Sequence, residues 1–232
     1  MRTEGLTDVK QLHSYFVARI ATLVKSRWGK DVIGWDELLD AGDNLPDGAV
    51  IMSWRGTKGG ERSIALGHRA VMSPTSHCYF DFRQSDSETE HGANWASTQD
   101  SSPVYLSILL VVLLKLTRSL ECNAEYPITV ERVREFDPLP ACQTLDERRR
   151  AHALVLGGQG NLWSERMATG AEVEYMAYPR ACALADALWS PATAAASFSS
   201  RLRCHMRRLR RAGVNFRRPD GVADRSQPVA FA

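Results

Sequence analysis

The sequence lacks two features that would mark common classes of protein: a long hydrophobic run and an excess of one charge. Its most apolar stretch, 103–114 (PVYLSILLVVLL), ends at Lys115, which is short of the roughly 20 residues that a helix needs to cross a bilayer. The formal net charge is only +2 over 232 residues, so the whole chain has little attraction for polyanions. We therefore expect neither a membrane nor a nucleic acid as its partner.

One segment departs from this balance of charge. Residues 201–218 contain eight arginines and no acid, a composition that could bind a polyanion. Leu202, Met206 and Leu209 recur between the arginines at helical spacing. That spacing favours the plainer interpretation, which is the solvated face of a terminal helix.

Closely paired cysteines are also absent. The five cysteines are Cys78, Cys122, Cys142, Cys182 and Cys204, and no two are separated by only two residues. Zinc ribbons and thioredoxin-like redox sites need such pairs. An odd and scattered set gives no disulfide framework, although one bridge would be compatible with the count. We expect no metal and no cofactor.

Helical and strand patterns alternate along the chain. Apolar residues follow helical spacing over 8–28, and shorter helical patterns fall at 61–66 after a Gly-Gly turn, 146–155, 171–189 with a break at Pro179, and 198–212. Apolar strand patterns fall at 31–35, 49–54, 70–73 with an extension to Asp81, and 155–163. This alternation predicts an α/β fold with a parallel sheet.

Four strand–helix units make half of a (β/α)8 TIM barrel, which usually needs about 250 residues. The fold that we expect is therefore the C-terminal half of such a barrel, over 1–232. A half-barrel leaves two open sheet edges, and open edges attract further strands. The expected partner of these edges is either a second copy of the chain, in a homodimer, or a missing N-terminal half.

Strand ends repeat one local pattern, in which an aromatic residue is followed two positions later by an acid. The three examples are Trp35-Asp36-Glu37, Tyr79-Phe80-Asp81 and Trp163-Ser164-Glu165, and a fourth strand ends in Trp54-Arg55-Gly56. A single tryptophan of this kind is more often core packing, and a single acid more often a helix cap. Four aromatic residues at strand ends instead favour a sugar site, because sugars offer apolar C–H faces to aromatic rings and hydroxyls to carboxylates.

Longer motifs carry a family resemblance. The segments VIGWDELLDAG, AVIMSWRG, SPTSHCYFDFRQ, LGGQGNLWSE and EYMAYPRACALADALWSP resemble, in order and spacing, the second half of the catalytic domain of glycoside hydrolase family 20. Members of this family are β-N-acetylhexosaminidases, which are lysosomal, secreted or periplasmic. The resemblance implies that the chain hydrolyses terminal non-reducing N-acetylhexosamine residues of glycans. Its first ten residues lack the apolar core of a signal peptide, so the compartment is left open.

The resemblance implies roles for individual residues. Tyr79 would donate its hydroxyl to the acetamido carbonyl oxygen of the substrate. Asp81 and Glu165 would accept hydrogen bonds from hydroxyls of the terminal sugar. The tryptophans that would surround the N-acetyl group are Trp35, Trp54 and Trp163. Asp36 and Glu37 belong to the same motifs, and a supporting role in the loop is as compatible with their position.

The family's chemistry is substrate-assisted and retaining: the acetamido oxygen attacks the anomeric carbon while a glutamic acid protonates the leaving oxygen. The Asp-Glu pair that performs this chemistry lies in an HxGGDE-like motif, and no such motif occurs in the 232 residues. We therefore assign no catalytic residue in the chain and expect it to be inactive alone. The alternative interpretations are a non-catalytic carbohydrate-binding remnant and a truncated product that does not fold alone.

A second departure from the family is internal. Residues 97–126 intervene between the YFD motif and the segment 127–138, and they resemble nothing expected there. They contain the apolar run and no sugar-site motif. We expect this atypical insertion to lie outside the barrel core.

Overall fold

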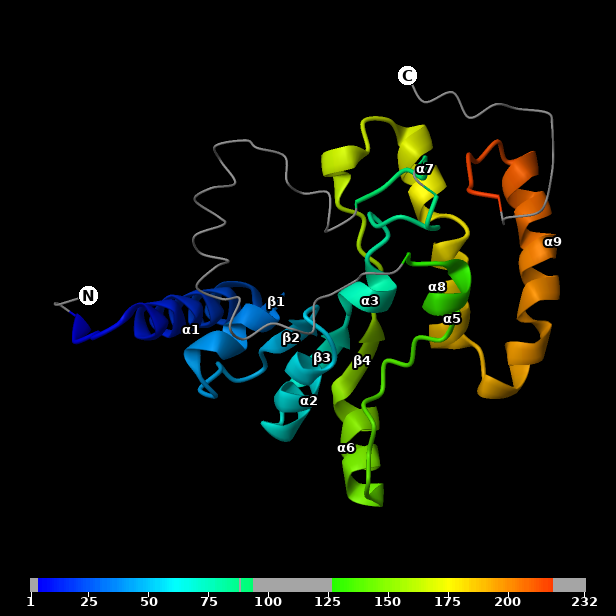
Figure 1. Cartoon of the computed structure of the whole chain (residues 1–232). Coiled ribbons are helices and arrows are strands. Elements are labelled where there is room, and N and C mark those ends of the chain that lie inside the picture. Colours follow the sequence, from blue (N-terminus) through cyan, green and yellow to red (C-terminus); the bar gives the residue numbers. More distant parts are fainter. Residues whose placement is uncertain (1–3, 88, 94–126, 219–232) are drawn as a thin grey trace.

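The computed structural model describes residues 4–87, 89–93 and 127–218. A four-stranded sheet forms its centre, with the strands in the order β1-β2-β3-β4 and every neighbouring pair parallel (Figure 1). The strands are β1 (Ile33–Trp35), β2 (Val50–Ser53), β3 (Arg69–Met72) and β4 (Val155–Gly158). The predicted α/β class with a parallel sheet is confirmed. The predicted insertion at 97–126 lies outside the described residues.

Helices connect and flank these strands. The α-helices are α1 (Val9–Trp28), α2 (Lys58–Ala65), α3 (Thr75–Cys78), α5 (Val130–Arg134), α6 (Leu145–Leu154), α7 (Gly170–Ala177), α8 (Arg180–Trp189) and α9 (Phe198–Arg211). Short 3-10 helices are η2 (Asp36–Ala41), η4 (Ser164–Arg166) and η5 (Ala192–Ser197). The helix α1 lies at the β1 end of the sheet, whereas α8 and α9 lie at the β4 end (Figure 1). Among the described residues, none of these helices has the length and hydropathy of a membrane span.

Local signals fix the ends of several helices. The Asp8 side chain accepts a hydrogen bond from Gln11 N at 2.8 Å and so caps the start of α1, and Gly29, with a φ of 62°, caps its end. Thr144 and Thr169 form capping boxes at the starts of α6 and α7. The predicted break at Pro179 is confirmed, because α7 ends before it and α8 begins after it.

The start of α2 corrects the prediction of a Gly-Gly turn before a helix at 61–66. Gly59 and Gly60 lie inside the first turn of the helix. A Cβ atom at Gly60 would lie 2.3 Å from the Met72 sulfur, and one at Gly59 would lie 2.8 Å from Asp36. The glycines are therefore needed for the close packing of α2 on the sheet, not for a turn.

Two strands are shorter than the sequence patterns predicted. The pattern from Ala70 to Asp81 is not one strand, because β3 ends at Met72 and the short helix α3 begins after Pro74. The pattern from Val155 to Trp163 also ends early, at Gly158. Beyond β3, Cys78, Tyr79 and Phe80 are buried without belonging to a strand, whereas beyond β4 Leu162 and Trp163 stay 39% and 42% exposed.

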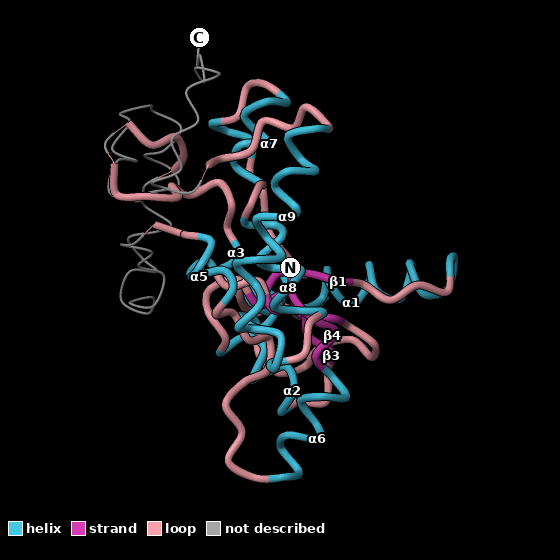
Figure 2. The backbone as a smooth tube through the Cα atoms, turned by 90° about the vertical axis from the view of Figure 1, so that its right-hand side faces the viewer, coloured by secondary structure: helices cyan, strands magenta, loops and turns pink. Residues whose placement is uncertain are grey.

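The main core lies around β3, β4 and the helices α5 and α8. Met72, Ile128 and Val133 are fully buried there, together with Phe80 and Ala183. The helix α1 is different, since Ala21 alone among its residues is buried. Figure 2 shows α1 projecting away from the sheet.

The apolar residues that predicted α1 stay largely exposed. Phe16 is 61% exposed and Leu23 is 43% exposed. Apolar side chains are exposed at both sheet edges as well, with Ile33 on β1 at 52% and Leu156 on β4 at 55%. Large apolar surfaces left open in this way usually meet another polypeptide.

Asp186 joins three helices in the C-terminal part. Its buried carboxylate forms ion pairs with Arg134 of α5 and Arg201 of α9, and it accepts a hydrogen bond from Ser190 at 2.8 Å. Burial acts to raise the pKa of this carboxyl, but the hydrogen bonds from Arg201 and Ser190 outweigh it and hold the pKa below its usual range. The ionised form therefore stabilises the packing of α5, α8 and α9.

Replacing Asp186 tests this junction. Asp186→Asn should lower the free energy of unfolding by about 3 kcal/mol, because it leaves two arginines without their buried partner. Urea denaturation followed by circular dichroism measures the change. The matched control is Asp146→Asn, at an aspartate that is 94% exposed and pairs with Arg149, where a loss below about 0.5 kcal/mol is expected. Equal losses in the two variants would contradict the junction.

Candidate functional site

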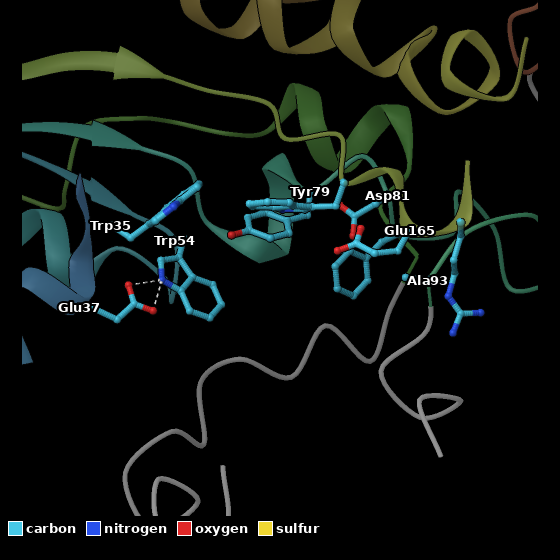
Figure 3. A pocket seen from close by; sticks show the side chains of 10 residues that line it. Trp35, Glu37, Trp54, Tyr79, Asp81, Ala93 and Glu165 are labelled. Carbon is cyan, nitrogen blue, oxygen red and sulfur yellow. Dashed lines mark hydrogen bonds between the residues drawn. The ribbon is translucent and has the colours of Figure 1, made fainter. Parts of the chain in front are cut away.

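A pocket of about 470 Å³ opens at the carboxyl ends of the strands. Its lining residues are Trp35, Glu37, Trp54, Tyr79, Asp81, Phe82, Ala93, Trp163, Glu165 and Arg166 (Figure 3). All six residues predicted for substrate binding are in this set. Their role in binding stays a prediction. A pocket of this volume suits one small ligand, such as a single sugar ring.

Aromatic rings form one continuous wall of the pocket. The ring centroids of Trp35 and Trp163 are 5.9 Å apart, those of Tyr79 and Trp163 are 6.5 Å apart, and those of Trp54 and Tyr79 are 6.2 Å apart. These spacings are typical of interacting aromatic pairs. Because each of the four residues ends or follows one of four adjacent parallel strands, the sheet order directs them toward the same edge.

Tyr79 and Trp163 reach this edge through loops that pair beyond the strands. Phe80 N donates to Asn161 O at 2.7 Å, and Asn161 N donates to Cys78 O at 2.7 Å. The Asn161 side chain also donates to the Ser73 hydroxyl at 2.6 Å. The buried Asn161 therefore extends the pairing of β3 with β4 as far as the pocket. Sequence reasoning quoted Asn161 within GQGNLW but assigned it no role.

Burial sets the protonation of two pocket residues. The Tyr79 side chain is 8% exposed, and burial, with the charge of Asp81, raises the pKa of its hydroxyl. The hydroxyl therefore remains a neutral donor at neutral pH. Burial, with a smaller contribution from Glu165, also raises the pKa of the Asp81 carboxyl to about 6. Asp81 Oδ1 is buried with no protein hydrogen-bond partner, so the protein leaves one acceptor of this carboxyl unused.

Arg180 holds the backbone on both sides of Asp81. Its fully buried guanidinium donates to Phe80 O at 2.5 Å and to Phe82 O at 2.8 Å, and it also donates to Ile128 O at 3.2 Å. Sequence reasoning missed this arginine, because only the folded contacts distinguish it from the many exposed arginines of the chain. The available signal was the position of Arg180 in the tripeptide Pro179-Arg180-Ala181, inside a segment that resembles the family.

Four other lining residues were also not predicted. Glu37 was left between a site role and a loop role, and the structure places it in the pocket wall. Arg166 follows the WSE motif directly, whereas Phe82 and Ala93 meet through an isolated parallel bridge in the loop after α3. Among the described residues, no cluster of three or more histidine, cysteine, aspartate or glutamate side chains could hold a metal ion.

The pocket combines flat apolar surfaces with a few directed polar groups. The aromatic wall can pack against a sugar ring or a methyl group, and Tyr79 can donate to a carbonyl oxygen. Asp81 and the exposed Glu165 can accept from hydroxyls. Such a set can bind and orient an N-acetylated sugar.

Comparison with known proteins agrees with this chemistry. A model of the catalytic domain of glycosyl hydrolase family 20 matches residues 1–192. The chain is 34% identical over 222 residues to a β-hexosaminidase of Porphyromonas gingivalis, covering 94% of the chain and 24% of that protein. It is 29% identical over 185 residues to a β-hexosaminidase of Vibrio furnissii, covering 80% of the chain and 25% of that protein. The chain thus spans about a quarter of the length of these relatives.

Solved structures give the same result for the fold. A family 20 exo-β-N-acetylglucosaminidase of Vibrio harveyi, in complex with N-acetylglucosamine, is similar with a TM-score of 0.73 and 25% identity. That similarity covers 95% of this chain and 29% of the Vibrio chain. A β-N-acetylhexosaminidase of Streptomyces coelicolor is similar in fold with a TM-score of 0.67 at 20% identity, over 93% of this chain and 38% of that one.

The raised pKa of Asp81 makes a prediction about stability. Because the folded state holds this proton more tightly than the unfolded chain does, ionisation of Asp81 opposes folding. The difference in unfolding free energy between the wild type and Asp81→Asn should therefore fall as the pH rises from about 4 to 6, by up to about 3 kcal/mol. Urea titrations at several pH values measure it.

The matched control for Asp81 is Glu165→Gln, which removes a carboxyl group from an exposed position in the same pocket. A pH-dependent loss of the same size in this control would assign the effect to the total charge of the pocket instead of the burial of Asp81. A difference that did not change between pH 4 and 6 would contradict the prediction.

Proposed function

The chain belongs to glycosyl hydrolase family 20, and on that premise we propose that it forms the acetamide-binding part of a β-N-acetylhexosaminidase active site. The complete site would hydrolyse terminal non-reducing N-acetylhexosamine residues of glycans by substrate-assisted retaining catalysis. The observation that carries the proposal is the pocket of about 470 Å³, whose lining joins an aromatic wall to the Tyr79 hydroxyl and to the carboxyl groups of Asp81 and Glu165.

We further infer that the sheet is the C-terminal half of a (β/α)8 barrel, supplied over 1–232. The all-parallel order and the exposed apolar side chains at both edges, Ile33 and Leu156, support this inference. The chain also spans only 24% of its Porphyromonas gingivalis relative. The open edges would be covered by the N-terminal half of the barrel or by a second copy of the chain in a homodimer.

Within the proposed site, Trp35, Trp54 and Trp163 surround the N-acetyl group of the substrate. With Tyr79 their rings form a continuous aromatic wall, against which a planar acetamide and its methyl group can pack. Holding the acetamido oxygen close to the anomeric carbon converts a collision into an internal attack, which can contribute on the order of 7 kcal/mol or more in ideal cases.

Tyr79 and the carboxylates act on the polar groups of the sugar. The Tyr79 hydroxyl donates to the acetamido oxygen and so fixes the direction of attack. Asp81 and Glu165 accept from the hydroxyls of the terminal sugar and hold the ring against the aromatic wall. With a pKa of about 6, the Asp81 carboxyl is mostly ionised at neutral pH and accepts as a charged group.

The proton for the leaving oxygen must come from another group. The Glu37 carboxylate already accepts the indole N–H of Trp54, and the other two pocket carboxylates are assigned to hydroxyls. The Asp-Glu motif of the family is absent from the 232 residues. We therefore propose that this chain positions the substrate and that a separate segment protonates the leaving group.

Hydrolysis of a chromogenic N-acetylglucosaminide tests this division. The 232-residue chain alone should show no turnover above background, because a positioned general acid contributes about 10²–10⁴-fold. Addition of the preceding barrel segment of a β-hexosaminidase relative, which carries the Asp-Glu pair, should restore turnover. Rapid hydrolysis by the chain alone, abolished by one carboxylate substitution within it, would overturn the division. Binding without turnover in the reconstituted protein would favour a carbohydrate-binding remnant.

Tyr79 gives a second test in the reconstituted enzyme. Tyr79→Phe should lower kcat by about 10²-fold or more and change KM much less, because its hydrogen bond strengthens as charge develops in the transition state. Steady-state kinetics separate the two constants. The matched control is Tyr175→Phe, at a tyrosine whose hydroxyl donates to Glu90 at 2.9 Å outside the pocket. Equal effects in the two variants would contradict the proposed role of Tyr79 in the reaction.

A further inference from the structure

We propose that Glu37 is a positioning residue, which holds the indole ring of Trp54 in place as a wall of the acetamide pocket. The inference rests on the proposed function, since it concerns the same pocket. The motif pattern left the role of this carboxylate open. In the proposed role Glu37 binds a protein side chain and does not bind the substrate.

The geometry joins two neighbouring strand ends. Both carboxylate oxygens of Glu37 lie within reach of Trp54 Nε1, at 3.2 Å for Oε1 and 3.0 Å for Oε2 (Figure 3). Glu37 lies in η2 directly after β1, and Trp54 directly follows β2. The two strands pair in register, with Trp35 opposite Met52, so the contact follows from the sheet.

The hydrogen bond between the Trp54 indole and the Glu37 carboxylate belongs to a strong class. An indole N–H can only donate, and a hydrogen bond to an ionised carboxylate is roughly twice as strong as one between neutral groups. Within the described residues, both hydrogen bonds of the Trp54 ring go to Glu37. Trp54 is half-buried and packs against the core and Tyr79, and Glu37 adds a directed contact to the edge of its ring.

Asp36, the neighbour of Glu37, holds the backbone of Trp54. Its buried carboxylate accepts Trp54 N at 3.1 Å and Arg55 N at 3.2 Å, and it pairs with Arg55 Nε at 2.6 Å. Consecutive acids of the first strand end therefore fix one tryptophan of the second, Asp36 through the main chain and Glu37 through the side chain. Because Asp36 restrains only the main chain, the orientation of the indole ring depends on Glu37.

The orientation of Trp54 affects its neighbour Tyr79. The two rings lie at 6.2 Å with an interplanar angle of 31°, and Tyr79 is the proposed donor to the acetamido oxygen. A rotated indole would interrupt the aromatic wall and withdraw one of the ring contacts that hold Tyr79 in place. Loss of Glu37 should therefore weaken recognition of the acetamide more than recognition of the rest of the sugar.

Nuclear magnetic resonance of the full chain tests the contact directly. The six tryptophans give six indole N–H signals, and Trp54→Phe identifies the one from Trp54. In Glu37→Leu this signal should move upfield and exchange faster with water, because the acceptor is gone. In Glu37→Gln it should stay near its wild-type position, because the amide oxygen still accepts. Glu61→Leu, which removes an exposed carboxylate of α2, should leave it unchanged.

Sugar titrations of the same variants test the consequence. We expect the wild type to prefer N-acetylglucosamine over glucose, and Glu37→Leu to reduce that preference by about tenfold, while Glu37→Gln keeps most of it. An unmoved indole signal in Glu37→Leu, or an unchanged preference beside an intact wild-type preference, would overturn the inference. Equal affinity of the wild type for both sugars would instead overturn the proposed function, and with it the acetamide role of Trp54.

Discussion

The arrangement of the pocket depends most on the hydrogen bonds that the buried guanidinium of Arg180 donates to backbone carbonyls. The guanidinium donates to carbonyls on both sides of Asp81 and to Ile128 O in the segment before α5. Carbonyls that turn away from a regular ladder must find donors, because an unpaired buried carbonyl is costly. One side chain of α8 supplies these donors. The loop after α3 can therefore leave the strand geometry and carry Tyr79 and Asp81 into the pocket.

The parallel sheet provides the second constraint. Because β1 to β4 run in the same direction, the residues that follow them gather at one edge. For this reason the four aromatic residues could be placed together from the sequence, and the carboxylates Asp81 and Glu165 with them. Periodicity also predicted α1, and its long amphipathic pattern made the prediction secure even though its apolar face is exposed here.

Contacts between distant segments could not be predicted. Gly59 and Gly60 have the composition of a turn, and only the approach of Asp36 and Met72 explains why they lie in a helix. The residues between Met72 and Tyr79 have strand-like composition, but Pro74 starts a helix there. Arg180 is one of many arginines, and its buried site exists only once α8 packs beside the loop after α3. Local pattern therefore predicted which residues line the pocket, but not the residues that support them.

The open sheet and the proposed division of the chemistry have one physical cause. A barrel mouth is a ring of strand ends, and four strands supply half of that ring. The proposed half contains the groups that we propose to bind the sugar, Tyr79 and Asp81 among them, and the backbone of both is held by contacts within the described residues. In the proposed site, the binding groups keep their positions without the other half of the ring, and that half supplies the proton donor. The exposed apolar edges at Ile33 and Leu156 are where that half would attach, so closing the sheet and completing the active site become the same event.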